Sequence, residues 1–146
     1  MSLPIKRVIA ALLAVSAAYV GVWAAAFPAS FYRDFPLPGR NWVSMLGPYN
    51  EHLTRDVGAL YLALLVVSVW AFRRPSATAM AVTGGAWLMF NAQHFLWHSL
   101  HLSAFPMIDK IGNVTSLGVV LILSILLLLP TREVPTREVP TREAST

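Results

Sequence analysis

Three of the four histidines of this 146-residue chain are close together, at His94, His98 and His101. At about 100° per residue, steps of four and three place them within an arc of roughly 60° on one face of a helix. The residues around them are mostly apolar. Because ionisable groups are costly at membrane depth, this face is expected to point into protein and to mark a functional site.

A second group of ionisable residues comes earlier in the chain. Glu51 and Arg55 are four residues apart, and so are His52 and Asp56, so each charge has a partner on its own helix. A helix that starts near residue 49 and one that ends near residue 102 run in opposite directions, and a rise of ~1.5 Å per residue puts the two groups at similar depth. We therefore expect one pocket that contains both groups.

Imidazole and carboxylate groups together suit a divalent metal ion. His94 and His98, or His98 and His101, can supply two nitrogens from one helix, and the third ligand must come from the earlier group. The predicted metal ligands are His52, Asp56, His94, His98, His101 and Glu51. A haem is the other cofactor that fits, with His52 on one side and a histidine of the later helix, His94 or His98, on the other. Phe95 stands where a zinc peptidase motif has glutamate, which argues against a peptidase.

Two other interpretations use the same residues. The histidines and acids can form a hydrogen-bonded network that only fixes helix packing, as in an accessory membrane subunit. Alternatively, His94 or His98 carries a proton for a membrane enzyme that acts on a lipophilic substrate. In that case an apolar cavity is expected, lined by Tyr49, Tyr61, Trp87 and Trp97.

The composition indicates an integral membrane protein. Hydrophobic residues make up 56% of the chain, charged residues only 12%, and the mean hydropathy is +0.59. The net charge of +4 lies beside apolar segments, so it indicates topology and does not predict nucleic-acid binding. The chain has no cysteine, which excludes disulfides, thiolate metal sites and thiol catalysis.

Four apolar segments predict an all-α fold, a membrane-embedded four-helix bundle with short loops over residues 1–129. The expected spans are residues 8–27, 49–72, 77–102 and 111–129. Gly84 and Gly85 are expected to allow close helix packing. Residues 130–146 repeat Pro-Thr-Arg-Glu-Val and are expected to be a disordered tail. The first segment also fits a signal peptide cleaved near residues 24–26, and both interpretations stay open.

Basic residues flank the predicted spans at Lys6, Arg7, Arg73 and Arg74 and recur in the tail. They predict that both termini are cytoplasmic, in a bacterial inner membrane. The proline-rich connector at residues 28–49 is expected along the membrane surface, with Arg33 and Arg40 at lipid headgroups. Asp109, Lys110 and Asn113 begin the last span and are expected to border the histidine site.

The stretch at residues 47–58, Gly-Pro-Tyr-Asn-Glu-His-Leu-Thr-Arg-Asp-Val-Gly, precedes a span and then the histidine helix. This order resembles uncharacterised actinobacterial four-span membrane proteins, which are loosely similar to the DoxX-like group, over most of residues 5–129. The resemblance implies a four-helix bundle and a link to membrane redox or quinone complexes. The partners we expect are the lipid bilayer and a membrane complex or further copies of the chain, and no nucleic acid.

Overall fold

The computed structural model describes residues 1–131, and within them the chain is helical and contains no strand. The α-helices are α1 (Leu3–Ala26), α2 (Pro28–Asp34), α3 (Glu51–Arg73), α4 (Ala77–Leu100) and α5 (Met107–Leu128), with short 3-10 helices η1 (Ser44–Leu46) and η2 (Leu102–Ala104). The predicted all-α class is confirmed. The short helix α2 was not expected, and the predicted tail, from residue 132 on, lies outside the described residues.

Three of the helices, α1, α3 and α5, are long and apolar enough to cross a membrane. Helix α4 is as long as α1, with 24 residues, but its polar residues keep it outside this group. Its interior carries Asn91, Gln93, His94 and His98. The structure therefore agrees with a membrane protein that has three apolar helices, one fewer than the number of spans predicted.

Local signals explain where the helices begin and end. Asn50 caps α3, because its side-chain oxygen accepts a hydrogen bond from the backbone N–H of Leu53 at 3.1 Å. Ser76 caps α4 in the same way through the N–H of Ala79 at 3.0 Å. Helix α5 ends at Leu128, just before Pro130, which cannot continue a helix. Asn50 thus fixes the entry from the connector into α3, and Ser76 fixes the start of α4 after the α3–α4 turn.

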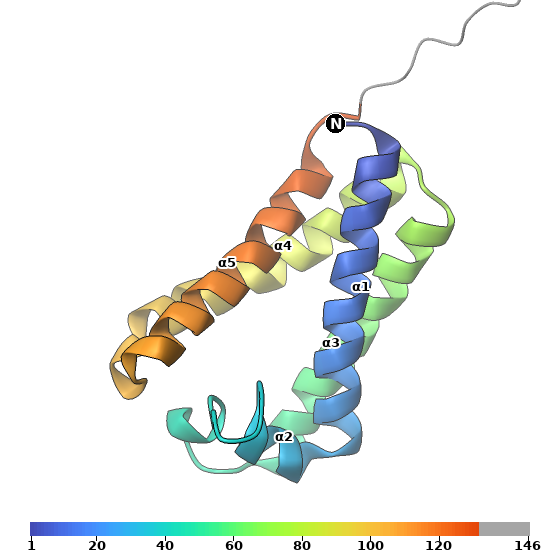
Figure 1. Cartoon of the computed structure of the whole chain (residues 1–146). Coiled ribbons are helices and arrows are strands. Elements are labelled where there is room, and N and C mark those ends of the chain that lie inside the picture. Colours follow the sequence, from blue (N-terminus) through green and yellow to red (C-terminus); the bar gives the residue numbers. More distant parts are fainter. Residues whose placement is uncertain (132–146) are drawn as a thin grey trace, which may run out of the picture.

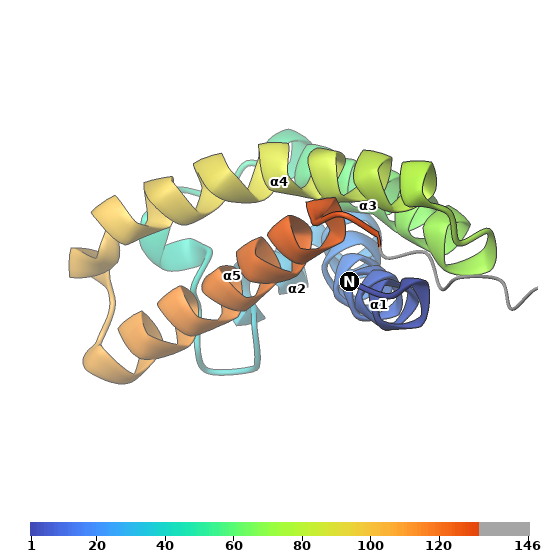
Figure 2. The same ribbon diagram turned by 90° about the horizontal axis from the view of Figure 1, so that it is seen from above.

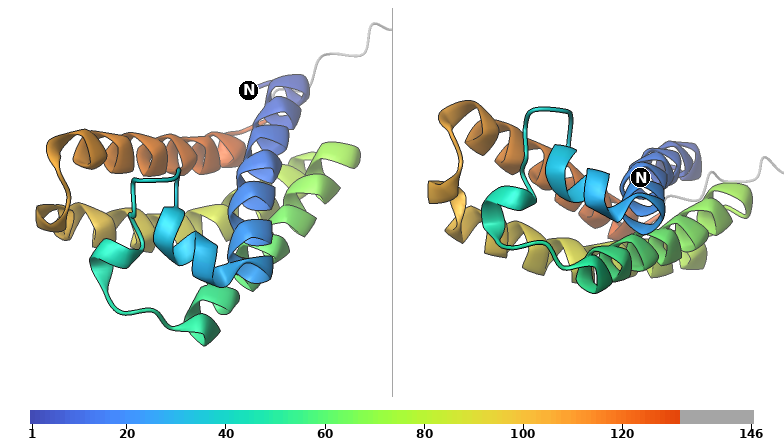
Figure 3. Two further views of the ribbon diagram at one scale, coloured as in Figure 1. Left: turned by 60° about the horizontal axis from the view of Figure 1, so that its bottom comes forward. Right: turned by 90° about the horizontal axis from the view of Figure 1, so that it is seen from below.

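The four long helices form a V made of two antiparallel pairs (Figure 1). Helix α1 lies along α3, and α4 lies along α5. The pairs meet at the end that carries the N-terminus, the α3–α4 turn and the end of α5, which we call the closed end. They diverge at the other end, the open end. The connector, residues 27–50, occupies the space between the arms there, as views from above and below show (Figures 2 and 3).

Glycines allow the helices of each pair to approach closely. A Cβ at Gly58 of α3 would overlap the backbone of Ala25 in α1. A Cβ at Gly84 of α4 would lie 2.8 Å from the Cβ of Leu127 in α5. This confirms the close packing predicted for Gly84, whereas Gly85 faces open space.

Buried hydrogen bonds tie α4 to its neighbours on both sides. The Trp87 indole donates to Ser68 Oγ of α3 at 2.8 Å, and the Thr83 hydroxyl donates to the Val67 carbonyl at 3.1 Å. The Asn91 amide donates to Ser124 Oγ of α5 at 3.0 Å. The bonds that hold these helices together are thus made by residues other than the histidines and acids for which a packing network was considered.

The closed end is completed by a buried cation. Lys6 is only 2% exposed, and its ammonium donates to the Leu127 carbonyl at 2.8 Å, to the Leu129 carbonyl and to Thr131 Oγ1 at 3.1 Å. The two carbonyl groups are at the C-terminal end of α5, where a positive charge also complements the helix dipole. The N-terminal amine donates to the Pro130 carbonyl at 2.7 Å. Helix α1 is therefore bonded to the end of α5 as well as packed on α3.

Candidate functional site

The open end contains a cavity of about 600 Å³ under the connector. Its walls come from α1, the connector, α3, α4 and α5, so no single element forms the site. Most of the lining is aromatic or aliphatic, as a binding site for a small apolar molecule requires. Characteristic wall residues are Tyr19, Phe31, Phe35, Trp42, Val57, Tyr61 and Leu117.

Two histidines of α4 contribute polar groups to this wall. His94 and His98 are one helical turn apart, with ring centroids 4.5 Å apart and planes at 62°. Phe90 stacks on the His94 ring at 5.0 Å, and Trp97 contacts the His98 ring edge-on at 5.3 Å. Both imidazoles adjoin the cavity, and the aromatic neighbours restrict how each ring can turn.

The cavity also contains buried polar atoms without partners. Within residues 1–131, two buried side-chain atoms make no hydrogen bond, His98 Nδ1 and Asn113 Oδ1, and both residues line this cavity. Asn113 is only 1% exposed. Leaving a buried polar atom unpaired costs roughly 1–3 kcal/mol, so such atoms are rare and call for an explanation. A bound molecule with a polar group would supply the missing partners.

The connector is held over the cavity by Asp109 at the start of α5. This carboxylate is buried, and its Oδ1 accepts hydrogen bonds from the Trp42 indole at 3.0 Å and from Arg40 Nη1 at 3.3 Å. Arg40 was predicted at lipid headgroups, and the structure pairs it with Asp109 instead. Of the three residues expected to border the site, Asn113 lines the cavity, Asp109 anchors its cover, and Lys110 is not part of the lining.

Tyrosines secure other parts of the connector. The Tyr19 hydroxyl donates to the Pro36 carbonyl at 2.6 Å, and the Tyr32 hydroxyl donates to the Gly47 carbonyl at 2.8 Å. The Tyr32 ring packs on Tyr49 at 5.1 Å. Desolvation, followed by the nearby Glu51 carboxylate, raises the pKa of Tyr49 above its ordinary value, so this phenol stays neutral at physiological pH. The cover is thus fixed at several points by neutral donors.

His101, the third predicted histidine of the cluster, lies outside the cavity. Helix α4 ends at Leu100, so His101 no longer follows the helical repeat. Its ring stacks on Trp97 with centroids 4.1 Å apart, and its Nδ1 lies 2.7 Å from the Trp97 carbonyl. It is exposed and is not among the residues that line the cavity.

The earlier ionisable group does not reach the histidines either. His52 and Asp56 pair with each other at 3.4 Å, with side chains 83% and 58% exposed. Thr54 and Val57 of α3 face the cavity, and at about 100° per residue His52 and Asp56 point roughly 160° away from Thr54. The two groups were expected to converge because their depths match, but they lie on different faces.

Glu51 is not among the residues that line the cavity either. It accepts a hydrogen bond from Arg55 at 2.9 Å, and Arg55 also donates to the Ala25 carbonyl of α1 at 2.5 Å. The six predicted metal ligands thus fall into separate places, with only His94 and His98 adjoining the cavity. Within residues 1–131, no three histidine or carboxylate side chains form a group that could hold a metal ion.

Much of the wall was not identified from the sequence. Of the aromatic residues expected around an apolar cavity, Tyr61 lines it, Trp87 is buried in the core, and Tyr49 and Trp97 are not part of the lining. The connector was expected along the membrane surface, so its aromatic residues were not predicted to line the cavity. A usable signal was present in α3, where Thr54, Val57 and Tyr61 follow the spacing of one helix face.

A scan against protein-family models, a search of curated proteins and a search of solved structures each return no match for this chain. The resemblance to four-span and DoxX-like proteins therefore stays a prediction.

Proposed function

We propose that this protein binds a small, largely apolar molecule with one polar head group in the cavity at its open end. The observation that carries this proposal is the coincidence of an apolar, aromatic-lined cavity with the unpaired atoms His98 Nδ1 and Asn113 Oδ1. Apolar walls with a few polar groups that fix orientation are typical of sites for small lipophilic molecules.

The two unpaired atoms restrict the chemistry of the head group. Asn113 Oδ1 is an acceptor, so it needs an O–H or N–H donor, while His98 Nδ1 donates or accepts according to its tautomer. A hydroxyl group both donates and accepts hydrogen bonds, so it has the chemistry that both atoms need. A lipophilic alcohol, phenol or quinol fits this requirement, and the rings of Phe31, Phe35 and Tyr61 suit a flat apolar body.

The charge distribution supports the membrane placement that goes with this proposal. Among residues 1–131, the open end carries Arg33, Arg40, Arg55 and Lys110, balanced by Asp34, Glu51, Asp56 and Asp109. The closed end carries Lys6, Arg7, Arg73 and Arg74 and no acid. Arg132, Arg137 and Arg142 follow α5 in the sequence, so more basic residues belong to the side of the termini, and basic residues favour the cytoplasmic side whatever the number of acids. We therefore place both termini in the cytoplasm of a bacterial cell and the cavity in the outer half of the inner membrane.

Four spans are part of the same proposal. Helix α4 is long enough to cross and runs antiparallel to α5. Its polar groups Thr83, Trp87 and Asn91 are bonded to neighbouring helices, which lowers the cost of placing them in a bilayer. His94 and His98 face the cavity, so α4 presents mainly apolar residues to lipid, such as Met89, Leu96 and Leu100.

A second candidate follows from the close contact of His94 and His98. Two imidazoles one turn apart are a chelating pair for a divalent metal ion, with further ligands from a bound molecule or another chain. A haem held by one of these histidines, in a membrane redox role, belongs to the same candidate. His52 is on the opposite face of α3 and does not support a second axial position. The pair can also carry a proton if the bound molecule is a substrate.

One purification tests both candidates. The full chain is isolated in mild detergent, and one sample is analysed for extracted small molecules by mass spectrometry, for visible absorption and for metal content. We expect a stoichiometric lipophilic compound that carries a hydroxyl group. Asn113→Leu and His98→Phe should each lower its recovery about tenfold, since a well-placed hydrogen bond to a buried group contributes ~1.5 kcal/mol.

His52→Phe is the matched control, because it removes an exposed imidazole outside the cavity. A compound retained equally by wild type, Asn113→Leu and His98→Phe would refute binding at this site. A Soret band or stoichiometric metal that His98→Phe removes and His52→Phe preserves would establish the second candidate in place of the first.

A further inference from the structure

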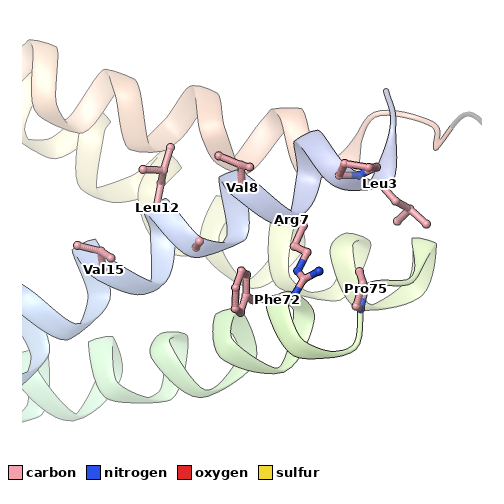
Figure 4. Close-up of a pocket in the computed structure, with 9 residues that line it drawn as sticks. Leu3, Arg7, Val8, Leu12, Val15, Phe72 and Pro75 are labelled. Atoms are coloured by element: carbon pink, nitrogen blue, oxygen red, sulfur yellow. The ribbon is translucent and has the colours of Figure 1, made fainter.

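A second hollow, of about 470 Å³, lies at the closed end between the start of α1 and the α3–α4 turn. Val8, Leu12 and Val15 form one wall along α1, and Phe72 and Pro75 form the opposite end (Figure 4). The single charged side chain in the lining is Arg7. The hollow is therefore an apolar groove with one cation, and it is separate from the cavity at the open end.

Arg7 extends from α1 toward Phe72 and Pro75 across the groove (Figure 4). Its guanidinium carbon lies 4.7 Å from the centroid of the Phe72 ring, a cation–π contact that holds the side chain in place. Within residues 1–131, the N–H groups of the Arg7 guanidinium donate no hydrogen bond to the protein. The planar face of the guanidinium is thus occupied, while its donors are available to an anion.

The charges around the groove favour an anion. Lys6, Arg73 and Arg74 are at the same end as Arg7, and the four acidic residues of the described chain are all at the open end. Lys6 is bonded to the end of α5, so its ammonium is occupied, whereas Arg7, Arg73 and Arg74 are exposed. A negative group at Arg7 meets attraction from three exposed cations and repulsion from none nearby.

We propose that this groove binds one anionic phospholipid, with its phosphate on Arg7 and one acyl chain along Val8, Leu12 and Val15. From Arg7 to Val15, α1 rises ~12 Å, close to the ~15 Å depth of the hydrocarbon in one leaflet. A free phosphate would use only Arg7 and leave the apolar wall uncovered. The combination of one cation at the membrane boundary and an apolar wall below it matches a lipid of the leaflet that faces the termini. This proposal depends on membrane insertion and not on the ligand of the other cavity.

The test uses the full chain in nanodiscs that contain equal amounts of phosphatidylglycerol and phosphatidylcholine with identical acyl chains. After transfer to detergent and washing, the lipids that remain bound are extracted and quantified. Wild type should retain phosphatidylglycerol over phosphatidylcholine about fivefold. Arg7→Gln should bring this ratio close to one, and Arg7→Lys should preserve most of it.

Arg33→Gln is the matched control, since it removes an exposed arginine at the open end, and it should leave the ratio unchanged. Leu12→Trp fills the groove with its charge intact and should lower total retained lipid. It decides the question if Arg7→Gln does not fold. A wild-type ratio of one, or an Arg7→Gln protein that keeps the wild-type ratio, would overturn the proposal. Thermal stability should also be compared with glycerol phosphate and with phosphatidylglycerol. Equal stabilisation by the two would overturn the proposal too, because the acyl chain would then contribute nothing.

Discussion

At the closed end of the V, the buried ammonium of Lys6 donates hydrogen bonds to the carbonyls of Leu127 and Leu129. At the open end, two buried polar atoms, His98 Nδ1 and Asn113 Oδ1, have no hydrogen-bond partner within residues 1–131. At the closed end, α4 and α5 are in direct contact at Gly84, whereas at the open end the two helix pairs diverge around a cavity of about 600 Å³.

This difference separates a stabilising region from a binding region within one small chain. Satisfied hydrogen bonds and close packing lower the free energy of the folded state. A cavity with unpaired polar atoms raises it, and proteins retain such features mainly where they bind something. Substitutions should therefore act on stability at the closed end and on ligand binding at the open end.

The largest expected effect is at the close contact between α4 and α5. Gly84→Leu places a side chain against Leu127 and the Ser124 carbonyl, with a Cβ already 2.8 Å and 3.0 Å from them. Overpacking of this kind costs about 3 kcal/mol, which thermal unfolding in detergent should show as a large fall in Tm. Gly85→Leu is the control, because nothing lies within 4 Å of its Cβ, and it should be neutral. Equal losses in both variants would mean that α4 and α5 do not pack as described.

The buried cation should give the next largest effect. Lys6→Met keeps the length of the side chain and removes the donor, so the Leu127 carbonyl and Thr131 Oγ1 lose a partner. We expect a loss of about 2 kcal/mol in the free energy of unfolding. Arg74→Met removes a cation that is exposed at the same end and should change it little. If both variants lost the same free energy of unfolding, the positive charge would account for the role of Lys6, and its hydrogen bonds to the end of α5 would not.

The anchor of the connector should have a smaller effect on stability and a local effect on motion. Asp109→Asn removes the charge that Arg40 and Trp42 contact, at a cost of about 1 kcal/mol. Amide hydrogen exchange in the connector should become faster while exchange in α1 and α3 stays the same. Asp56→Asn, at an exposed carboxylate, is expected to alter neither. Unchanged exchange in the connector of Asp109→Asn would remove this carboxylate from the cover.

The smallest change in stability is also the most informative about the comparison. Asn91 and Asn113 are both buried asparagines, but Asn91 donates to Ser124 and Asn113 Oδ1 is unpaired. Asn91→Leu should destabilise the protein by about 1 kcal/mol, because Ser124 Oγ loses a donor. Asn113→Leu should leave ligand-free protein equally stable or slightly more stable. A destabilised Asn113→Leu protein would show that its amide is satisfied and would weaken the case for a ligand.

The sequence alone was sufficient for the fold class and for most helix boundaries. Apolar segments of spanning length gave four long helices within a few residues of their observed ends, and caps such as Asn50 and Ser76 are local signals. It also identified His94 and His98, because ionisable side chains within an apolar segment stand out in composition. These are properties of neighbouring residues, which depend little on how the helices are arranged.

The tertiary structure decided which of those residues meet. His52 was expected to match His98 in depth, but the rotation of α3 about its axis leaves His52 exposed and brings Thr54 and Tyr61 to the cavity. His101 lies apart from His94 and His98 because α4 ends at Leu100, one residue before it. The aromatic residues of the connector line the cavity, where Trp42 donates a hydrogen bond to Asp109 of α5. Helical periodicity fixes which residues share a face, but only packing between helices selects the face that is buried, because apolar residues on every side make several faces suitable.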